Sequence, residues 1–166
     1  GDVELLEKVK ACYASLFEAR AIFYRQENKF DNFKVGIAVP VQKMVQSDTS
    51  GVMFTIDPIS NDKSSITVEA VYGLGEMIVQ GTITPDHYEI DKKTLSIMKK
   101  QIEKQTIMLT MVGKQTKEVK VSRNLQSQQK IKNSLIEEIA RLGKKIEHHY
   151  FFPQDIEWAI ENGKVY

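Results

Sequence analysis

The sequence predicts an α+β fold in which mainly antiparallel strands lie between two long amphipathic helices. Residues 2–26 place apolar side chains at helical spacing between lysines, glutamates and arginines, and residues 127–149 repeat the pattern with Ser127 as the N-cap. Between them, runs rich in β-branched residues alternate with turn-forming residues, and no internal repeat occurs. An order of helix, strands, helix and final hairpin is typical of this class.

The first strand is expected within residues 35–45, where valines and isoleucines recur with a period of two. Pro40 lies inside this run and cannot donate to a ladder, so the strand should lie at an edge or be bulged there. The polar cluster 46–51 is typical of a turn, and the apolar run 52–56 follows it. These segments predict a hairpin.

The remaining elements follow in order. Residues 76–80 fit either a helical turn or a short strand, and 91–94 are expected to form the turn of a hairpin. Residues 99–126 are polar and weakly patterned, which predicts an excursion over the surface. Strands are expected at 66–72, 88–90, 95–98, 107–111, 119–121 and 155–160.

The two ends of the sequence suggest that it is part of a longer protein. Asn162-Gly163 is typical of a tight hairpin turn, but the strand after it stops three residues later at Tyr166. Strands usually run about 5–6 residues. Because position 1 is also Gly rather than Met, we expect the native chain to be longer.

Length and charge limit the class of protein. The 166 residues are expected to form one domain, 1–166, and are enough to bury a core without disulfides. A net charge of +1 without a basic block argues against a nucleic-acid binder, and no apolar run reaches the ~18–20 residues of a membrane span. The single cysteine, Cys12, is expected on the buried face of the first helix, and the cytoplasm is the expected location.

The common nucleotide-binding and hydrolase signatures are absent from the sequence. Gly73-Leu74-Gly75 follows a predicted strand and is either an anion-binding turn or a plain tight turn. Asp155 and Glu157 alternate on a predicted strand, so their carboxylates share one face, roughly 7 Å apart at Cα. Such a pair either binds Mg²⁺ together with phosphate oxygens or is simply solvated.

The three histidines are expected to be structural or solvated. His148 and His149 are adjacent on a predicted helix, so they diverge by about 100° and cannot share a metal. His87 follows Thr84-Pro85-Asp86 in an expected turn. From the residues alone, the chain is an α+β domain with an indication of phosphate and Mg²⁺ binding.

Four sequence blocks in the correct order resemble the nucleotide-binding domain of the phosphoenolpyruvate synthase family. They are SLFEARAIFYR (15–25), VQKMVQSDTSGVMFTIDP (41–58), VEAVYGLGEMIVQGTITPDHY (68–88) and DIEWAIENGKVY (155–166). The resemblance runs from about residue 11 to the C-terminus, and only 99–126 lacks a recognisable motif. It implies that the chain is the C-terminal lobe of an ATP-grasp domain.

The resemblance also implies an enzyme that converts ATP, pyruvate and water to phosphoenolpyruvate, AMP and phosphate through a phosphohistidine. In that family the phosphohistidine domain, the pyruvate-binding barrel domain and the N-terminal lobe belong to other parts of the chain. Carried over to this sequence, Gln42, Met44, Val45 and Glu69 match nucleotide-binding positions, and Asp155 and Glu157 match the Mg²⁺-binding carboxylates. No catalytic residue is assigned.

Two alternatives remain open at this point. Besides the phosphoenolpyruvate synthase type, the sequence fits the nucleotide domain of a related phosphotransferase, of the pyruvate phosphate dikinase or rifampin phosphotransferase type, or a non-catalytic stand-alone binding module. Without the lysine and arginine of the other lobe, the triphosphate loses charge-assisted hydrogen bonds of about 1.5–3 kcal/mol each. We therefore expect the 166 residues alone to be inactive and to bind ATP weakly.

Overall fold

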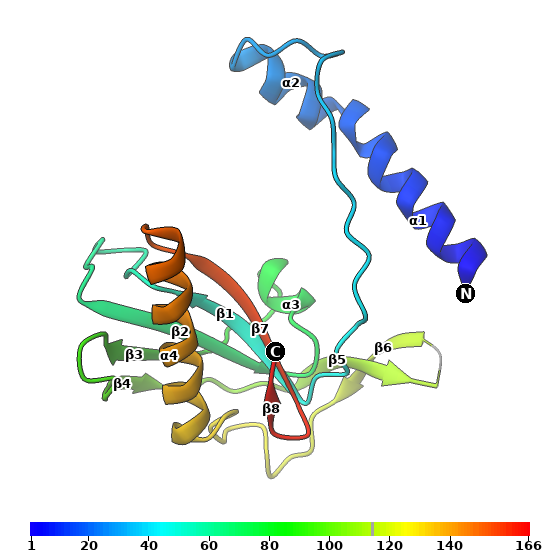
Figure 1. Ribbon diagram of the computed structural model, residues 1–166. Helices are drawn as coiled ribbons and strands as arrows, with labels where there is room; N and C mark the ends of the chain where they lie inside the picture. Colours follow the sequence, from blue (N-terminus) through cyan, green and yellow to red (C-terminus); the bar gives the residue numbers. More distant parts are fainter. Residues whose placement is uncertain (114) are drawn as a thin grey trace. The chain divides into compact units, whose positions relative to one another are not determined.

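A computed structural model describes residues 1–113 and 115–166. They divide into two compact units, Gly1–Lys43 and Met44–Tyr166. The prediction of mixed helix and mainly antiparallel sheet is confirmed (Figure 1). No helix in the described ranges combines the length and apolar character that a membrane crossing requires.

The first unit contains α1 (Asp2–Ala14), a 3₁₀ turn η1 (Ser15–Phe17) and α2 (Ala19–Glu27). The prediction of one continuous helix over 2–26 is wrong, because Glu18 has an extended backbone with ψ 148°. The guanidinium of Arg25 donates to the backbone carbonyl of Leu16, which the break leaves without its helical partner, and to Asn32 Oδ1 at 2.7 Å. The 5% exposed Arg25 therefore stabilises the break that the apolar spacing does not reveal.

The apolar stripe of α1 is exposed. No residue of this helix is buried, and Leu6 is 60% accessible. The expectation that Cys12 lies in a buried face is wrong, since Cys12 is a free, exposed cysteine. The helical spacing of apolar residues predicted a helix, but it does not show whether another element covers the apolar stripe.

The second unit is built on a six-stranded antiparallel sheet with the strand order β4-β3-β2-β1-β7-β8. Its other elements are a two-stranded sheet and the helices α3 (Glu76–Val79) and α4 (Asn133–Tyr150). The strands are β1 (Thr49–Phe54), β2 (Ser65–Tyr72), β3 (Asp86–Asp91), β4 (Ile97–Gln101), β5 (Ile107–Val112), β6 (Gln115–Lys120), β7 (Asp155–Glu161) and β8 (Lys164–Val165).

Several strand predictions are confirmed. The run 66–72 forms β2, the hairpin around 91–94 joins β3 to β4, and Asn162-Gly163 joins β7 to β8. Asn162 and Gly163 have φ values of 53° and 77°, which is the conformation that this two-residue turn requires. Within 99–126, β5 pairs with β6, although β6 begins at Gln115 rather than at the expected 119.

The expected strand at 35–45 is absent, and so is its hairpin with 52–56. Alternating β-branched residues favour an extended backbone, but they do not supply a partner strand, and Pro40 removes one donor. The expected turn at 46–51 is also wrong in its second half, because Thr49 begins β1. Gly51 lies in the middle of the sheet, where a Cβ atom would approach Glu69 O to 1.8 Å.

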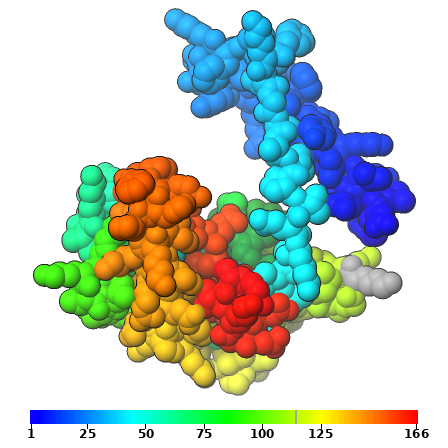
Figure 2. Space-filling model, in the orientation of Figure 1, coloured from blue at the N-terminus to red at the C-terminus, as the bar shows by residue number. Residues whose placement is uncertain are grey.

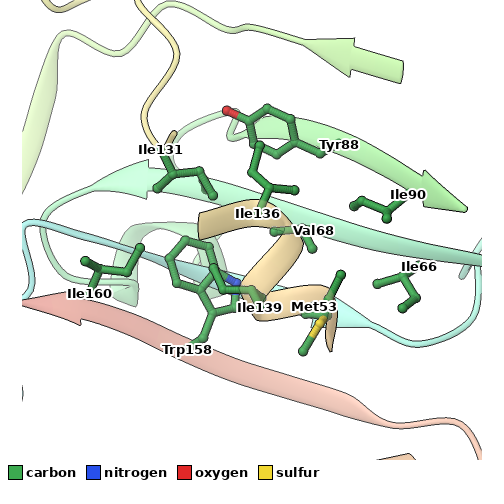
Figure 3. Close-up of a cluster of buried hydrophobic side chains, with 12 residues drawn as sticks. Met53, Ile66, Val68, Tyr88, Ile90, Ile131, Ile136, Ile139, Trp158 and Ile160 are labelled. Atoms are coloured by element: carbon green, nitrogen blue, oxygen red, sulfur yellow. The ribbon is translucent and has the colours of Figure 1, made fainter. Parts of the chain in front are cut away.

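Helix α4 covers one face of the sheet (Figure 1) and forms the core with it. Figure 2 shows α4, in orange, on the surface of the second unit. Figure 3 shows Ile136 and Ile139 of α4 among the buried side chains of the strands. The helix begins at Asn133 rather than at the predicted Ser127, and its buried face is made of Ile136, Ile139, Ala140 and Gly143. Leu142, another apolar residue of this helix, is 38% exposed.

Candidate functional site

The sheet face opposite α4 carries the acidic candidate residues. Along β1, Met53 points into the core with α4, so its neighbours Val52 and Phe54 lie on the other face. Val52 is opposite Glu157 of β7 on one side and opposite Glu69 of β2 on the other. Glu157 and Glu69 are therefore two strands apart, about 10 Å between Cα atoms.

A second row of residues runs beside the first on this face. Phe54 lies opposite Asp155 of β7 and opposite Thr67 of β2, and Thr67 lies opposite Glu89 of β3. Asp155 and Glu157 are both exposed and occupy alternate positions of β7. We call this surface, defined by Glu69, His87, Glu89, Asp155 and Glu157, the carboxylate face.

The structure brings together three of the six residues that the sequence singled out. Glu69, Asp155 and Glu157 share the carboxylate face. Met44 and Val45 belong to the same unit and lie in the segment before β1, which forms no strand, and Met44 is 63% exposed. Gln42 belongs to the other unit, so its position opposite the carboxylates stays a prediction.

In the glycine turn after β2, the first two backbone N–H groups are bonded within the chain. Gly73 has φ +79°, and a Cβ atom there would come within 2.2 Å of Leu109 O. Its N–H donates to Asp48 O at 2.9 Å, and the N–H of Leu74 donates to Leu109 O at 2.9 Å. These two donors are thus used within the chain, which is incompatible with the alternative of an anion-binding turn built on them.

His87 lies between two carboxylates of the carboxylate face. Its Nδ1 is 3.6 Å from Glu69 Oε1 and its Nε2 is 3.5 Å from Glu89 Oε1. Lys99 Nζ of β4 contacts the same Glu89 oxygen at 2.7 Å. The contact with Glu69 raises the pKa of His87, and the charges of Glu69 and Glu89 add to this, whereas partial burial opposes it.

Sequence analysis missed the role of cross-strand neighbours on this face. It treated His87 as a structural or solvated residue in a turn, yet His87 lies within β3. It also left out Glu89, Lys99 and Thr67. The alternation of His87 and Glu89 was a usable signal, but their position beside Glu69 depends on strand register, which no local pattern specifies.

The donor set at Asp155 and Glu157 fits a metal that is completed by a ligand. Within residues 1–113 and 115–166, no three His, Cys, Asp or Glu side chains are placed to hold a metal together. Mg²⁺, however, is usually held by one or two protein carboxylates plus waters and substrate phosphates. Two exposed carboxylates on alternate positions of one strand match that requirement.

The sequence is similar to known proteins along its whole length. The family model described as pyruvate phosphate dikinase, AMP/ATP-binding domain, matches residues 1–166. A probable phosphoenolpyruvate synthase of Methanocaldococcus jannaschii is 43% identical over the whole chain, which covers 14% of that relative. The phosphoenolpyruvate synthase of Pyrococcus furiosus is 44% identical over the whole chain, which covers 21% of it.

A rifampicin phosphotransferase of Bacillus cereus is also similar, at 37% identity over the whole chain and 19% of the relative. The chain therefore spans at most about a quarter of the length of the curated relatives that it matches. Because the family model matches every residue of the sequence, the chain belongs to the pyruvate phosphate dikinase, AMP/ATP-binding domain family.

Proposed function

We propose that the chain is the ATP-binding second lobe of the ATP-grasp domain of a phosphoenolpyruvate synthase. The parent enzyme would convert ATP, pyruvate and water to phosphoenolpyruvate, AMP and phosphate, with the phosphohistidine and the pyruvate site on other domains. The family and the phosphoenolpyruvate synthases at 43–46% identity support this function. The observation that carries it is the shared face of Glu69, Asp155 and Glu157.

Each group has a distinct role in this proposal. Asp155 and Glu157 bind Mg²⁺, which when bound neutralises phosphate charge and orients the phosphate oxygens for transfer. Glu69, two strands away, accepts a hydrogen bond from another part of the nucleotide. Gln42 contacts the adenine side, and Met44 and Val45 offer apolar contact and backbone groups to the base.

The test is Glu157→Gln in the full-length enzyme. The substitution keeps the shape of an exposed side chain and removes one charge, so the fold should persist while Mg·ATP-dependent formation of AMP falls strongly. The matched control is Glu138→Gln, which alters an exposed residue of α4 on the opposite side of the sheet. Equal turnover of wild type and Glu157→Gln would remove Glu157 from the site.

Gln42→Ala tests the adenine side separately. We expect this variant to raise the ATP concentration needed for half-maximal rate more than it changes thermal stability, because Gln42 is exposed. An unchanged ATP requirement would contradict the assignment.

The rifampicin phosphotransferase relative favours one second candidate, a phosphotransferase with a different acceptor. The two candidates differ in the acceptor and not in the nucleotide domain. Measuring AMP formation by the full-length protein with pyruvate and with rifampicin in turn separates them, and we expect turnover with pyruvate.

A further inference from the structure

A four-residue polar cluster crosses β2, β3 and β4 on the carboxylate face. It consists of Glu69, His87, Glu89 and Lys99. Lys99 is bound to Glu89 by a hydrogen bond of 2.7 Å, so Glu89 already has a permanent cation. Glu69 has no such partner among the described residues, and its single ionic contact there is His87. His87 is therefore the link between Glu69 and the rest of the cluster.

The contacts of Glu69 use only one of its two carboxylate oxygens. His87 Nδ1 lies 3.6 Å from Oε1, and no hydrogen bond between described residues reaches Oε2. The side chain of Glu69 is 28% exposed, so Oε2 can accept a hydrogen bond from a ligand. An ionised carboxylate accepts from hydroxyl or amino groups and repels phosphate oxygens.

The protonation state of His87 sets the net charge of the cluster. When His87 is protonated, the cluster holds two acids and two bases, and when it is neutral one negative charge is uncompensated. Asp57, in the loop after β1, adds a negative charge that acts on both His87 and Lys99. Asp155 and Glu157 of β7 add two more on the same face, so an uncompensated charge here disfavours a polyphosphate.

We propose that His87 is a positioning residue for nucleotide binding. It holds Glu69 through Oε1, so that Glu69 is an oriented hydrogen-bond acceptor, and its positive charge reduces the repulsion between Glu69 and the phosphates. This role rests on the proposed function. It differs from a purely structural cross-strand ion pair, which would contribute to the stability of the sheet and leave nucleotide affinity unchanged. The raised pKa of His87 favours the protonated form that this role requires.

The experiment measures the KM for Mg·ATP and kcat of the full-length enzyme as a function of pH. For His87→Gln we expect KM to rise about fivefold at about pH 6.5, with kcat within about twofold, since an ion pair of this kind is worth up to ~1 kcal/mol. The KM of wild type should rise toward that of the variant by about pH 8.5. His87→Lys keeps a cation at every pH, so it should retain a low KM across the range.

The matched control is His148→Gln, which changes an exposed histidine in the last turn of α4, on the other side of the sheet. Its KM should equal that of wild type. Thermal unfolding of each variant shows whether any change follows from stability alone. A His87→Gln enzyme with wild-type KM at every pH would overturn the positioning role. If Glu157→Gln is inactive in the same assay, the proposed function survives that result, and if Glu157→Gln is fully active, the proposed function itself fails.

Discussion

Replacing Asp86 by Asn removes a buried negative charge while keeping the size of the side chain. Both Asp86 and Lys130 have side chains that are 0% exposed, and Lys130 Nζ donates to Asp86 Oδ1 at 2.7 Å. The carboxylate also accepts from Tyr88 Oη at 2.8 Å, from the N–H of Glu103 at 2.9 Å and from the N–H of Lys130 at 3.0 Å. Burial raises the pKa of Tyr88, which keeps its hydroxyl a donor.

Asp86→Asn should destabilise the fold by about 3–5 kcal/mol, the usual cost of leaving one partner of a buried ion pair uncompensated. The amide also turns an NH₂ group toward donors, so one of the hydrogen bonds above is lost as well. Lys130 retains its contact with the Glu103 carbonyl, which does not neutralise its charge. A loss of this size is a large part of the about 5–15 kcal/mol that stabilises a typical domain.

Urea unfolding measures this prediction, with the fluorescence of Trp158, the only tryptophan and a member of the core, as the probe. Asp155→Asn, at an exposed position, is the control and should change the free energy of unfolding by less than about 0.5 kcal/mol. Adding Lys130→Met to Asp86→Asn should recover part of the loss, because no charge then remains unpaired. A loss below about 1 kcal/mol for Asp86→Asn, or strictly additive losses in the double variant, would refute the reasoning.

Three further predictions use the same unfolding assay. Gly51→Ala should lower the free energy of unfolding by about 3 kcal/mol, because the added Cβ would lie 1.8 Å from Glu69 O and 2.6 Å from Trp158 Cζ2. A neutral result would mean that the strands separate easily. Thr67→Val should raise the free energy of unfolding by about 1 kcal/mol, since the buried Oγ1 of Thr67 has no hydrogen-bond partner in the described residues. A loss of stability would indicate that Oγ1 does make a hydrogen bond. The raised pKa of His87 means that its charge stabilises the fold fully below about pH 6.5 and that this contribution disappears as pH rises through the native pKa. The free-energy difference between wild type and His87→Gln should therefore shrink from about pH 6 to about pH 9, and a constant difference would exclude an ionic contribution.

The fold was predictable where its signals are local. The Asn162-Gly163 turn and the hairpin around 91–94 depend on residues that fix their own backbone conformation. The start of β1 was not predictable in this way, because Thr49, Ser50 and Gly51 have the composition of a turn. Position 51 requires glycine because its neighbours in the sheet leave no room for a side chain, and this cause lies in tertiary packing rather than in local sequence.

The candidate site was predictable in part for the same reason. The shared orientation of Asp155 and Glu157 follows from the period of a strand and needs no knowledge of its partners. Placing Glu69 beside them needs the register of β1 with both β2 and β7, and placing His87 needs that of β3. Register is set by burial against α4 and by turns, so the sequence alone does not specify it.

The central strand β1 acquires its two neighbours at very different times during synthesis. Strands β1 to β4 pair in chain order, whereas β7 joins β1 across about a hundred intervening residues. A ribosome-bound nascent chain can thus assemble Glu69, His87 and Glu89 well before Asp155 and Glu157 have emerged. A polypeptide stopped short of β7 would present β1 as an open edge that can pair with other chains. Pairing of β7 with β1 therefore completes the carboxylate face and protects this edge against aggregation in the same late step.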